Sequence, residues 1–308
     1  MKYDVLVVGN ATMDLIFAGL PRFPVLGEDT LATDFAFIPG EAYTNAVALH
    51  RLGIRVAWAA DFGNDPFSQS ILQSARTENL DESWFVHHET SFQRVSVSAS
   101  FAHDRAFLSY YDKEPVIPAA FKALAQVDAR MILIPGLLYG PLFTSAIPLI
   151  RAKKMQIIMD GNFSGIKNLS TRSIRNAIRN TDVFLPNSRE ARSLTGMDDL
   201  TSAAFMLSSL VPQVAIKDGA NGAYGATGKT ITHVPSIPST VADTTGAGDC
   251  FTAGYIYGLL AGASQEDRLR YGNICGALST QKHGGTGFHV NAEILHAAYR
   301  KYYQPLDK

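Results

Sequence analysis

The hydrophobic positions of this chain fall into two kinds of segment. Six short runs are almost wholly apolar and rich in β-branched residues, which is typical of strands buried on both faces of a sheet. They are residues 5–8, 56–59, 131–134, 156–159, 183–185 and 214–216. Longer segments have the apolar spacing of helices, at residues 44–52, 67–76, 145–153, 188–194, 203–210, 250–260, 267–281 and 292–303. Strands that alternate with helices predict a three-layer α/β/α sandwich around a mostly parallel central sheet.

Three early segments follow a different pattern, in which apolar residues alternate with small or polar ones. They are residues 30–38, 94–101 and 107–111. Such alternation is typical of antiparallel strands with one exposed face. These strands either extend an edge of the central sheet or form a small separate β-sheet over its carboxyl edge. We predict such a lid from about residues 12–44 and 92–112, inserted in a single domain of residues 1–308.

Composition and charge limit the classes of partner. The 308 residues carry 27 Lys and Arg against 28 Asp and Glu, a formal net charge of −1, so bulk charge favours neither nucleic acid nor membrane. The most apolar later stretch, residues 131–143, is interrupted by two prolines and two glycines and cannot span a bilayer. The first apolar run is too short for a signal peptide. Cys250 and Cys275 lie in apolar stretches and are expected as free thiols, so we expect a cytoplasmic protein.

Two glycine-rich segments imitate phosphate-binding motifs. Residues 223–230 end in Gly-Lys-Thr, but the P-loop also needs a glycine at the position of Ala223, and Gly222 is one residue too early. The flanking residues predict a hairpin instead. Gly246 and Gly248 lack the third glycine of a dinucleotide fingerprint, because a phenylalanine occupies its position. Neither a P-loop nor a Rossmann dinucleotide site is predicted.

The most informative segment is Asp-Thr-Thr-Gly-Ala-Gly-Asp at residues 243–249, which an apolar helix follows at once. Backbone N–H groups at a helix N-terminus bind anions, and small residues allow the anion to approach closely. Asp249 is then either an ordinary helix cap or a base beside that anion site. A carboxylate next to backbone donors meets both needs of phosphoryl transfer to an alcohol, removal of a proton and stabilisation of negative charge.

The whole segment resembles the C-terminal signature of the ribokinase-like (PfkB) carbohydrate kinase family, and it lies near four fifths of the chain, as it does in that family. The resemblance implies that Asp249 is the catalytic base. It also implies that the amides of Gly246, Ala247 and Gly248 form the anion hole, with ATP as phosphate donor and Mg²⁺ as cofactor.

Two segments resemble the substrate-binding motifs of the same family. Asn10 and Asp14 follow the first strand, where the family's acid binds substrate hydroxyls. A second segment resembles the N-terminal signature, with Gly40 and Asn45 facing the sugar. Glu41 departs from the family, which usually has a second glycine there. Glu41 either accepts hydrogen bonds from extra hydroxyls or an amine of the substrate, or points to solvent.

The resemblance also places the nucleotide. Asn187 and Glu190 match an Asn-x-x-Glu element associated with Mg²⁺ and phosphate, although Glu190 alone also fits a solvated acid in a first helical turn. Asp160 and Asn162 resemble an Asp-x-Asn element near the phosphates. Lys217 either holds a phosphate or is a surface lysine at a strand end. The remaining residues expected around ATP are Gly219, Gly222 and Asn273.

A monovalent-cation loop is a further implication. Asp243 and Thr245 match positions that contribute to a K⁺ site in several members of the family. Residues 283–287 are expected to supply the other ligands, so K⁺ activation is predicted.

The reaction that these residues imply is phosphoryl transfer from ATP to a hydroxyl of a sugar or sugar derivative. A sugar phosphate is less favoured, because Arg94 and Arg105 form no cluster of cations in the lid segments. A nucleoside kinase is one alternative, and a non-catalytic relative that binds a sugar or nucleotide to regulate a partner is another. Aromatic side chains able to stack on a base are Phe35, Phe37, Tyr43, Phe92, Phe101 and Tyr111. We also expect a homodimer formed through the lid.

Overall fold

The computed structural model describes residues 2–101, 105–112 and 118–304. Its larger sheet has the strand order β13-β12-β11-β10-β9-β8-β1-β4-β5. The strands are β1 (Tyr3–Val8), β4 (Val56–Phe62), β5 (Phe85–His87), β8 (Ala129–Ile134), β9 (Gln156–Asp160), β10 (Val183–Leu185), β11 (Gln213–Lys217), β12 (Ala223–Thr227) and β13 (Thr230–Val234). All neighbours from β11 to β5 are parallel, whereas β11, β12 and β13 pair antiparallel. The mostly parallel sheet and the hairpin in place of a P-loop are confirmed.

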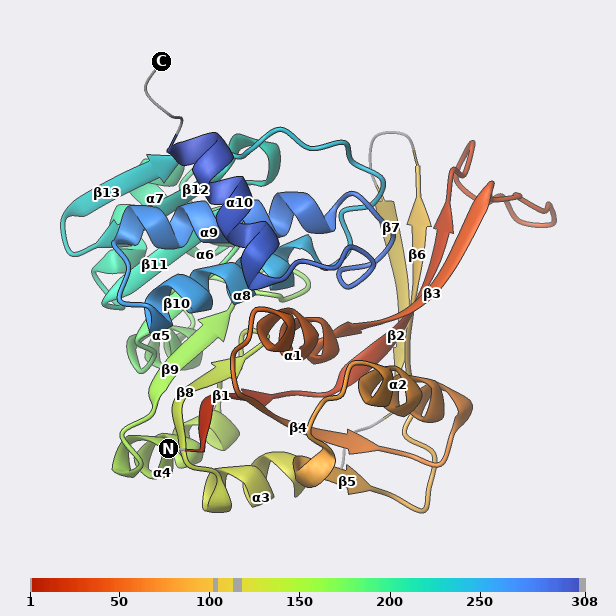
Figure 1. Ribbon diagram of the computed structural model, residues 1–308, viewed down its shortest axis with the longest axis horizontal. Coiled ribbons are helices and arrows are strands. Elements are labelled where there is room, and N and C mark those ends of the chain that lie inside the picture. The colour runs from red at the N-terminus through yellow and green to blue at the C-terminus, as the bar shows by residue number, and fades with distance from the viewer. Residues whose placement is uncertain (1, 102–104, 113–117, 305–308) are drawn as a thin grey trace.

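Helices cover both faces of this sheet (Figure 1). One hydrophobic cluster joins the sheet to α1 (Ala42–Arg51), α2 (Pro66–Thr77), α8 (Ala247–Leu260), α9 (Gln265–Ser279) and α10 (Ala292–Tyr303). The other joins it to α3 (Pro118–Gln126), α4 (Pro141–Ala152), α5 (Arg172–Arg179), α6 (Ser188–Thr195) and α7 (Leu200–Ser208). Successive strand residues such as Val5 and Leu6 belong to opposite clusters, because side chains alternate across a strand. The predicted three-layer α/β/α fold is therefore confirmed.

Some helix boundaries differ from the sequence-based expectation. Helix α4 begins at Pro141, not at residue 145, because proline is well tolerated in the first helical turn. Helices α3 and α5 were not predicted at all. Among the described residues, no helix is both long and apolar enough to cross a membrane. Cys250 and Cys275 are free and buried, as expected.

The lid is a separate sheet with the strand order β3-β2-β6-β7. Its strands are β2 (Ala11–Ala18), β3 (Asp34–Glu41), β6 (Arg94–Ser100) and β7 (Arg105–Tyr111). The alternative that these segments extend an edge of the central sheet is therefore wrong. The strand expected at residues 30–38 lies at 34–41 instead and includes a proline, which an edge strand tolerates. Asp14 lies within β2, so it caps neither a helix nor a turn.

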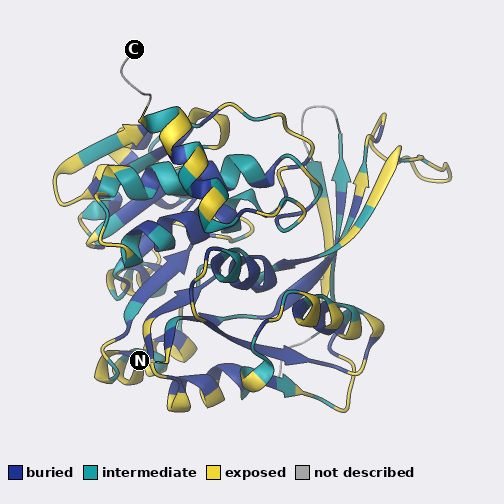
Figure 2. Ribbon diagram, viewed as in Figure 1, coloured by how far each residue is buried: buried dark blue, intermediate teal, exposed yellow. Residues whose placement is uncertain are grey.

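The two faces of the lid differ in character. Strand pairing places Phe17, Phe35 and Ala99 on one face, and all the aromatic side chains of this outer face are exposed. Asp14 and Ser96 pair on the opposite face. Figure 2 shows the outer lid strands largely exposed, whereas most strands of the central sheet are buried. The polar inner face is the one available to a site between lid and sheet.

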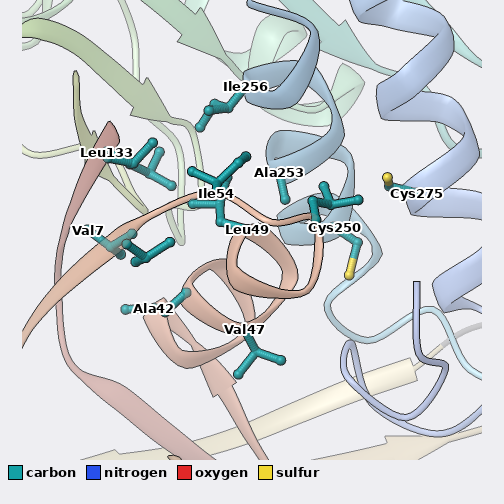
Figure 3. Close-up of a cluster of buried hydrophobic side chains, with 14 of the residues drawn as sticks. Val7, Ala42, Val47, Leu49, Ile54, Leu133, Cys250, Ala253, Ile256 and Cys275 are labelled. Carbon is teal, nitrogen blue, oxygen red and sulfur yellow. The ribbon is translucent and has the colours of Figure 1, made fainter. Parts of the chain in front are cut away.

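Helices α1 and α8 pack against each other through small and aliphatic side chains. Leu49 of α1 and Cys250 and Ala253 of α8 belong to one buried cluster (Figure 3). This contact fixes the first turns of both helices relative to each other. Those turns carry Asn45 and Asp249, so packing of the core positions two of the predicted site residues.

Candidate active site

The N-terminus of α8 is built from glycine where side chains would collide. Gly246 has a φ of 72°, in the left-handed region, and a Cβ atom there would lie 2.6 Å from the Cα of Gly285. A Cβ at Gly248 would instead lie 3.5 Å from Nζ of Lys217, which places that ammonium group beside the helix end. The N–H of Ala247 is directed at the carbonyl of Thr244 at a long 3.3 Å. A helix N-terminus, the kind of backbone that can bind an anion, therefore lies next to a cation.

Asp249 lies in the first turn of this helix and is held by α1. Asn45 donates its side-chain amide to Oδ1 of Asp249 at 2.8 Å. Burial raises the pKa of Asp249 to about 7, and the nearby charge of Asp160 adds to the shift, whereas Lys217 and the hydrogen bond from Asn45 oppose it. A carboxyl group with a pKa near 7 is well suited to accept a proton at neutral pH.

Asp14 faces the same region from the lid. Its carboxylate lies against Gly40, where a Cβ atom would be only 2.3 Å from Oδ2. A side chain at position 40 would therefore collide with the carboxylate of Asp14. Burial raises the pKa of Asp14 to about 7, and the charges of Glu41 and Asp249 raise it further. Asn45 also has a buried Oδ1 with no hydrogen-bond partner among the described residues. The region combines proton acceptors that suit the hydroxyl groups of a ligand.

Glu41 does not point freely to solvent, so that alternative is wrong. Its carboxylate forms an ion pair with Arg94 at 3.0 Å and accepts a hydrogen bond from the hydroxyl of Tyr111 at 3.3 Å. The guanidinium group of Arg94 lies over the ring of Tyr111, 4.3 Å from its centroid. Glu41 has φ 55° and ψ −126°, a conformation that favours glycine and costs a side-chain-bearing residue about 1–3 kcal/mol. The backbone thus keeps the shape of a glycine position while the side chain joins a lid cluster.

A cavity of about 850 Å³ lies between the α8 N-terminus and the end of β11. Its volume falls within the range of small-molecule sites. Its lining includes every residue predicted to bind the nucleotide or form the catalytic helix end: Asn187, Glu190, Lys217, Gly219, Gly222, Gly246, Ala247, Gly248, Asp249 and Asn273. The residues predicted to bind the acceptor do not line this cavity, but Asn45 connects to it through Asp249.

Lys217 is not a surface lysine. Its ammonium group lies 2.6 and 2.7 Å from the two carboxylate oxygens of Asp160, and both side chains are largely buried. Thr252 of α8 and the N–H of Gly161 donate to the same carboxylate at 2.7 Å each. Asp160 therefore holds Lys217 against the α8 end. Sequence motifs placed Asp160 near the phosphates but did not identify it as the partner of Lys217.

Glu190 is buried, so the interpretation as a solvated acid is wrong. Asn187 and Glu190 form a capping box, in which each side chain accepts from the backbone N–H of the other, at 2.9 and 2.8 Å. Burial raises the pKa of Glu190, while the charge of Lys217 opposes this. No three acidic, His or Cys side chains form a metal-ligand set within the described residues.

Asn273 and Gly222 shape the far wall of the cavity. The side-chain amide of Asn273 donates to the carbonyls of Val234 and Pro235 at 3.0 and 3.2 Å. Gly222 has a φ of 96°, and a Cβ atom there would lie 2.1 Å from the carbonyl oxygen of Val234. Both residues hold the chain that follows β13. Contact between Asn273 and adenine stays a prediction.

Asp243 and Asn10 have clear structural contacts. Asp243 accepts from the N–H and hydroxyl of Thr245 at 3.0 and 2.9 Å, and from the N–H of Gly284 at 2.8 Å. It thereby links the loop before α8 to the loop expected to complete a K⁺ site, and K⁺ binding itself stays a prediction. Asn10 is buried and accepts from the N–H of Asp61 at 2.8 Å, which ties the end of β1 to β4. Its substrate role likewise stays a prediction.

Arg105 is a site residue that the sequence analysis did not include. It begins β7, lines the cavity and donates to the hydroxyl of Thr244. A contact across 139 residues cannot be found by spacing. The only signal available was the presence of an arginine in a lid segment.

The layered fold, the lid and the buried acid at a helix N-terminus on the wall of a nucleotide-sized cavity define a small-molecule kinase of the ribokinase fold. A family model described as pfkB family carbohydrate kinase matches residues 2–290. The chain therefore belongs to this family and is a phosphotransferase of the carbohydrate kinase class.

The matches to known relatives span almost the whole length of those proteins. An uncharacterized sugar kinase of Archaeoglobus fulgidus is 37% identical over 248 residues, which are 77% of this chain and 96% of that protein. The ribokinase of Bacillus subtilis is 28% identical over 289 residues, 92% of this chain and 95% of that protein. The structure of Arabidopsis thaliana ribokinase complexed with ribose and ATP has a TM-score of 0.78 at 19% identity, and the match covers 96% of this chain and 98% of that chain.

Proposed function

We propose that this protein transfers the γ-phosphate of ATP to a hydroxyl group of a sugar or sugar derivative. The observation that supports this most is Asp249. It combines a pKa raised to about 7, a fixed position from Asn45, and a place on the wall of the cavity at the N-terminus of α8. A base and a set of backbone donors are thus side by side.

In the proposed reaction Asp249 accepts the proton of the acceptor hydroxyl. The hydroxyl oxygen forms the new bond to phosphorus, and the bond from that phosphorus to its bridging oxygen breaks, with the electron pair leaving on ADP. The amides of Gly246, Ala247 and Gly248 stabilise the negative charge on the moving group, and the helix dipole adds to this. Lys217, which lies beside Gly248, supplies positive charge at the same place.

The cavity fits a nucleoside triphosphate in size and in chemistry. Gly219, Gly222, Asn273 and the N-terminal residues of α8 all line it. Glu190 would help to hold Mg²⁺, which would neutralise phosphate charge. Asp243 and Thr245 would contribute to the proposed K⁺ site. Arabidopsis thaliana ribokinase, which binds ATP according to its structure's description, supports the choice of nucleotide.

The inner face of the lid favours a sugar over a nucleoside. Asp14, Ser96 and Ser109 lie on this face, and hydroxyl and carboxylate groups suit a polyol. Most of the aromatic residues proposed to stack on a base lie elsewhere, since Phe35 and Phe37 are on the outer face and Tyr43 packs in the core. Tyr111 lies on the inner face, but the guanidinium group of Arg94 lies over its ring, 4.3 Å from the centroid. A nucleoside acceptor or a purely regulatory role remains an outcome of the test below.

The exposed outer face of the lid supports the homodimer. Phe17, Phe35 and Phe37 are 38%, 53% and 43% exposed, and they form one apolar surface with Leu108. A second copy of the lid would remove this surface from water. Sedimentation equilibrium should then give twice the chain mass of 33.4 kDa, and a monomer at micromolar concentration would contradict the dimer.

The experiment for the function is ADP release with ATP, Mg²⁺ and K⁺ across a panel of sugars, sugar acids, amino sugars and nucleosides. Asp249→Asn keeps the size of the side chain and the contact with Asn45, and we expect it to lower turnover by about 10²-fold or more. Asp199→Asn is the matched control, because Asp199 caps α7 far from the cavity and Asn caps equally well. Wild-type turnover in Asp249→Asn would exclude the proposed mechanism. Binding of a panel compound without any turnover would favour the regulatory alternative.

A further inference from the structure

Arg105 reaches from the lid to the loop that precedes the anion hole. Its guanidinium group donates to the hydroxyls of Thr244 and Thr245 and lies 3.8 Å from the carboxylate of Asp243. These are the last three residues before Gly246. The contact thus connects the edge strand of the lid to the start of the catalytic helix.

The same side chain lies where acceptor and phosphate sites meet. Arg105 lines the cavity together with Lys217 and Asp249. It is also close enough to Asp14 that its charge opposes the burial that raises the pKa of that acid. On the acceptor side, Arg105 lies near Asp14. On the nucleotide side, it lies near the N-terminus of α8, where the anion hole is proposed. A phosphoryl group that moves from one side to the other passes between these two places.

Arg105 can be compared with the other cations that line the cavity, Lys217 and Arg189. The positive charge of Lys217 is matched at 2.6 Å by Asp160, so it changes the local field less than a lone ammonium group would. Arg189, another cation of the lining, is exposed on α6. Arg105 contacts two hydroxyls and lies 3.8 Å from the carboxylate of Asp243, a longer separation than the 2.6 Å between Lys217 and Asp160. An anionic phosphate oxygen is a stronger acceptor for a guanidinium group than a hydroxyl is.

We propose that Arg105 is a catalytic residue that the lid brings to the transfer site, where its guanidinium group contacts the phosphoryl group that moves. The proposal rests on the proposed function and adds a residue to it. An arginine carried by the lid would make catalysis depend on closure, because the open lid removes positive charge from the anion hole.

The first test measures binding and needs no acceptor. Affinities for ADP and for the β,γ-methylene analogue of ATP are measured by calorimetry with Mg²⁺ in wild type, Arg105→Gln and Arg105→Lys. We expect Arg105→Gln to weaken the analogue about tenfold more than ADP, since only the analogue has a terminal phosphate for the arginine to bind. Equal weakening of both nucleotides, or of neither, would overturn the proposal.

The second test uses an acceptor that supports turnover. Arg105→Gln should lower kcat about 10²-fold while KM for the acceptor changes less than threefold, and free guanidinium should restore part of the kcat of Arg105→Ala. A raised KM with unchanged kcat would show that Arg105 only anchors the lid or binds the acceptor, which overturns the proposal. Arg76→Gln is the control, because Arg76 forms an exposed ion pair with Glu82. If wild type phosphorylates no compound, the proposed function fails, and the binding test still judges Arg105.

Discussion

The nucleotide side and the acceptor side of this site treat buried charge in opposite ways. On the nucleotide side, Lys217 is matched by Asp160, and Glu190 is bound by the backbone of its own helix. On the acceptor side, Asp14 and Asp249 lie close enough to raise the pKa of Asp14, and burial raises both pKa values to about 7. On the nucleotide side, the protein itself supplies partners for the buried charges of Lys217 and Glu190. On the acceptor side, Asp14 and Asp249 are proton acceptors that suit the hydroxyl groups of a ligand.

The backbone shows the same contrast. Gly222 on the nucleotide side is required, because any side chain would collide with the carbonyl of Val234. Glu41 on the acceptor side has a positive φ although it carries a side chain. At these two positions the nucleotide wall keeps the residue that its geometry needs, whereas the acceptor wall combines a strained backbone with a specific side-chain contact. We expect the Glu41 contact to affect which acceptor is bound.

The strongest test of this contrast removes a partner on the satisfied side. Lys217→Met leaves the carboxylate of Asp160 buried without its cation, and we expect a loss of about 3–5 kcal/mol in the free energy of unfolding. Urea denaturation measures this value. The double variant Lys217→Met with Asp160→Asn should recover much of the loss, because no unpaired charge is left. Lys229→Met, in an exposed turn, is the control, and a stability equal to wild type in Lys217→Met would contradict the picture of a matched pair.

The second test uses pH on the unsatisfied side. Asp249 must be deprotonated to act as a base, so kcat/KM should fall about tenfold per pH unit below pH 7. Stability should change in the other direction. A folded pKa raised above the unfolded value means that the contribution of Asp249 to stability is full below pH 3.8 and is lost as the pH rises to about 7.

The shift sets an upper bound of about 4 kcal/mol on this effect. Unfolding free energies of wild type and Asp249→Asn at pH 5 and pH 8 give the measurement. The variant should be the more stable protein at pH 8 and lose that advantage at lower pH. Parallel pH curves for the two proteins would show that Asp249 is not a buried acid of raised pKa.

Much of the fold could be predicted from the sequence, because strands buried on both faces are continuous apolar runs. Helix α5 could not, since three arginines in eight residues conceal the stripe formed by Ile174, Ala177 and Ile178. Strand β2 lies in the predicted lid range of residues 12–44, but its bounds were not predicted, because its residues were interpreted as a binding motif. The separate lid sheet followed from alternation of apolar and polar residues, but the start of β3 did not, because register depends on pairing with β2.

The candidate site could be predicted where a motif follows a strand or begins a helix. Pairs of distant residues could not be predicted, because nothing in the sequence marks them. Lys217 and Asp160 are 57 residues apart, and Arg94 and Glu41 are 53 apart. These pairs decide which charges are matched. The sequence therefore predicts which residues line the cavity better than it predicts how their charges are paired.

The smallest effect is expected from substitution of Glu41. It distinguishes the cost of the strained backbone at Glu41 from the contribution of its ion pair with Arg94. Glu41→Gly removes the ion pair with Arg94 and also relieves a backbone conformation that costs about 1–3 kcal/mol. Because these two effects oppose each other, we expect the free energy of unfolding to change by less than about 1 kcal/mol. KM for the acceptor should nevertheless rise several-fold, since Arg94 and Tyr111 lose the carboxylate that holds them at the inner face of the lid.

Lys154→Gly provides the matched control for the backbone. Lys154 also has a positive φ, 57°, but it is exposed and far from the lid, so glycine there should stabilise the protein and leave KM unchanged. Glu41→Gln, which keeps the strain and loses the charge, should be less stable than Glu41→Gly. If Glu41→Gly left both stability and acceptor selectivity unchanged, the acceptor wall would not owe its selectivity to this cluster. The contrast between the two sides would then rest on Asp14 and Asp249 alone.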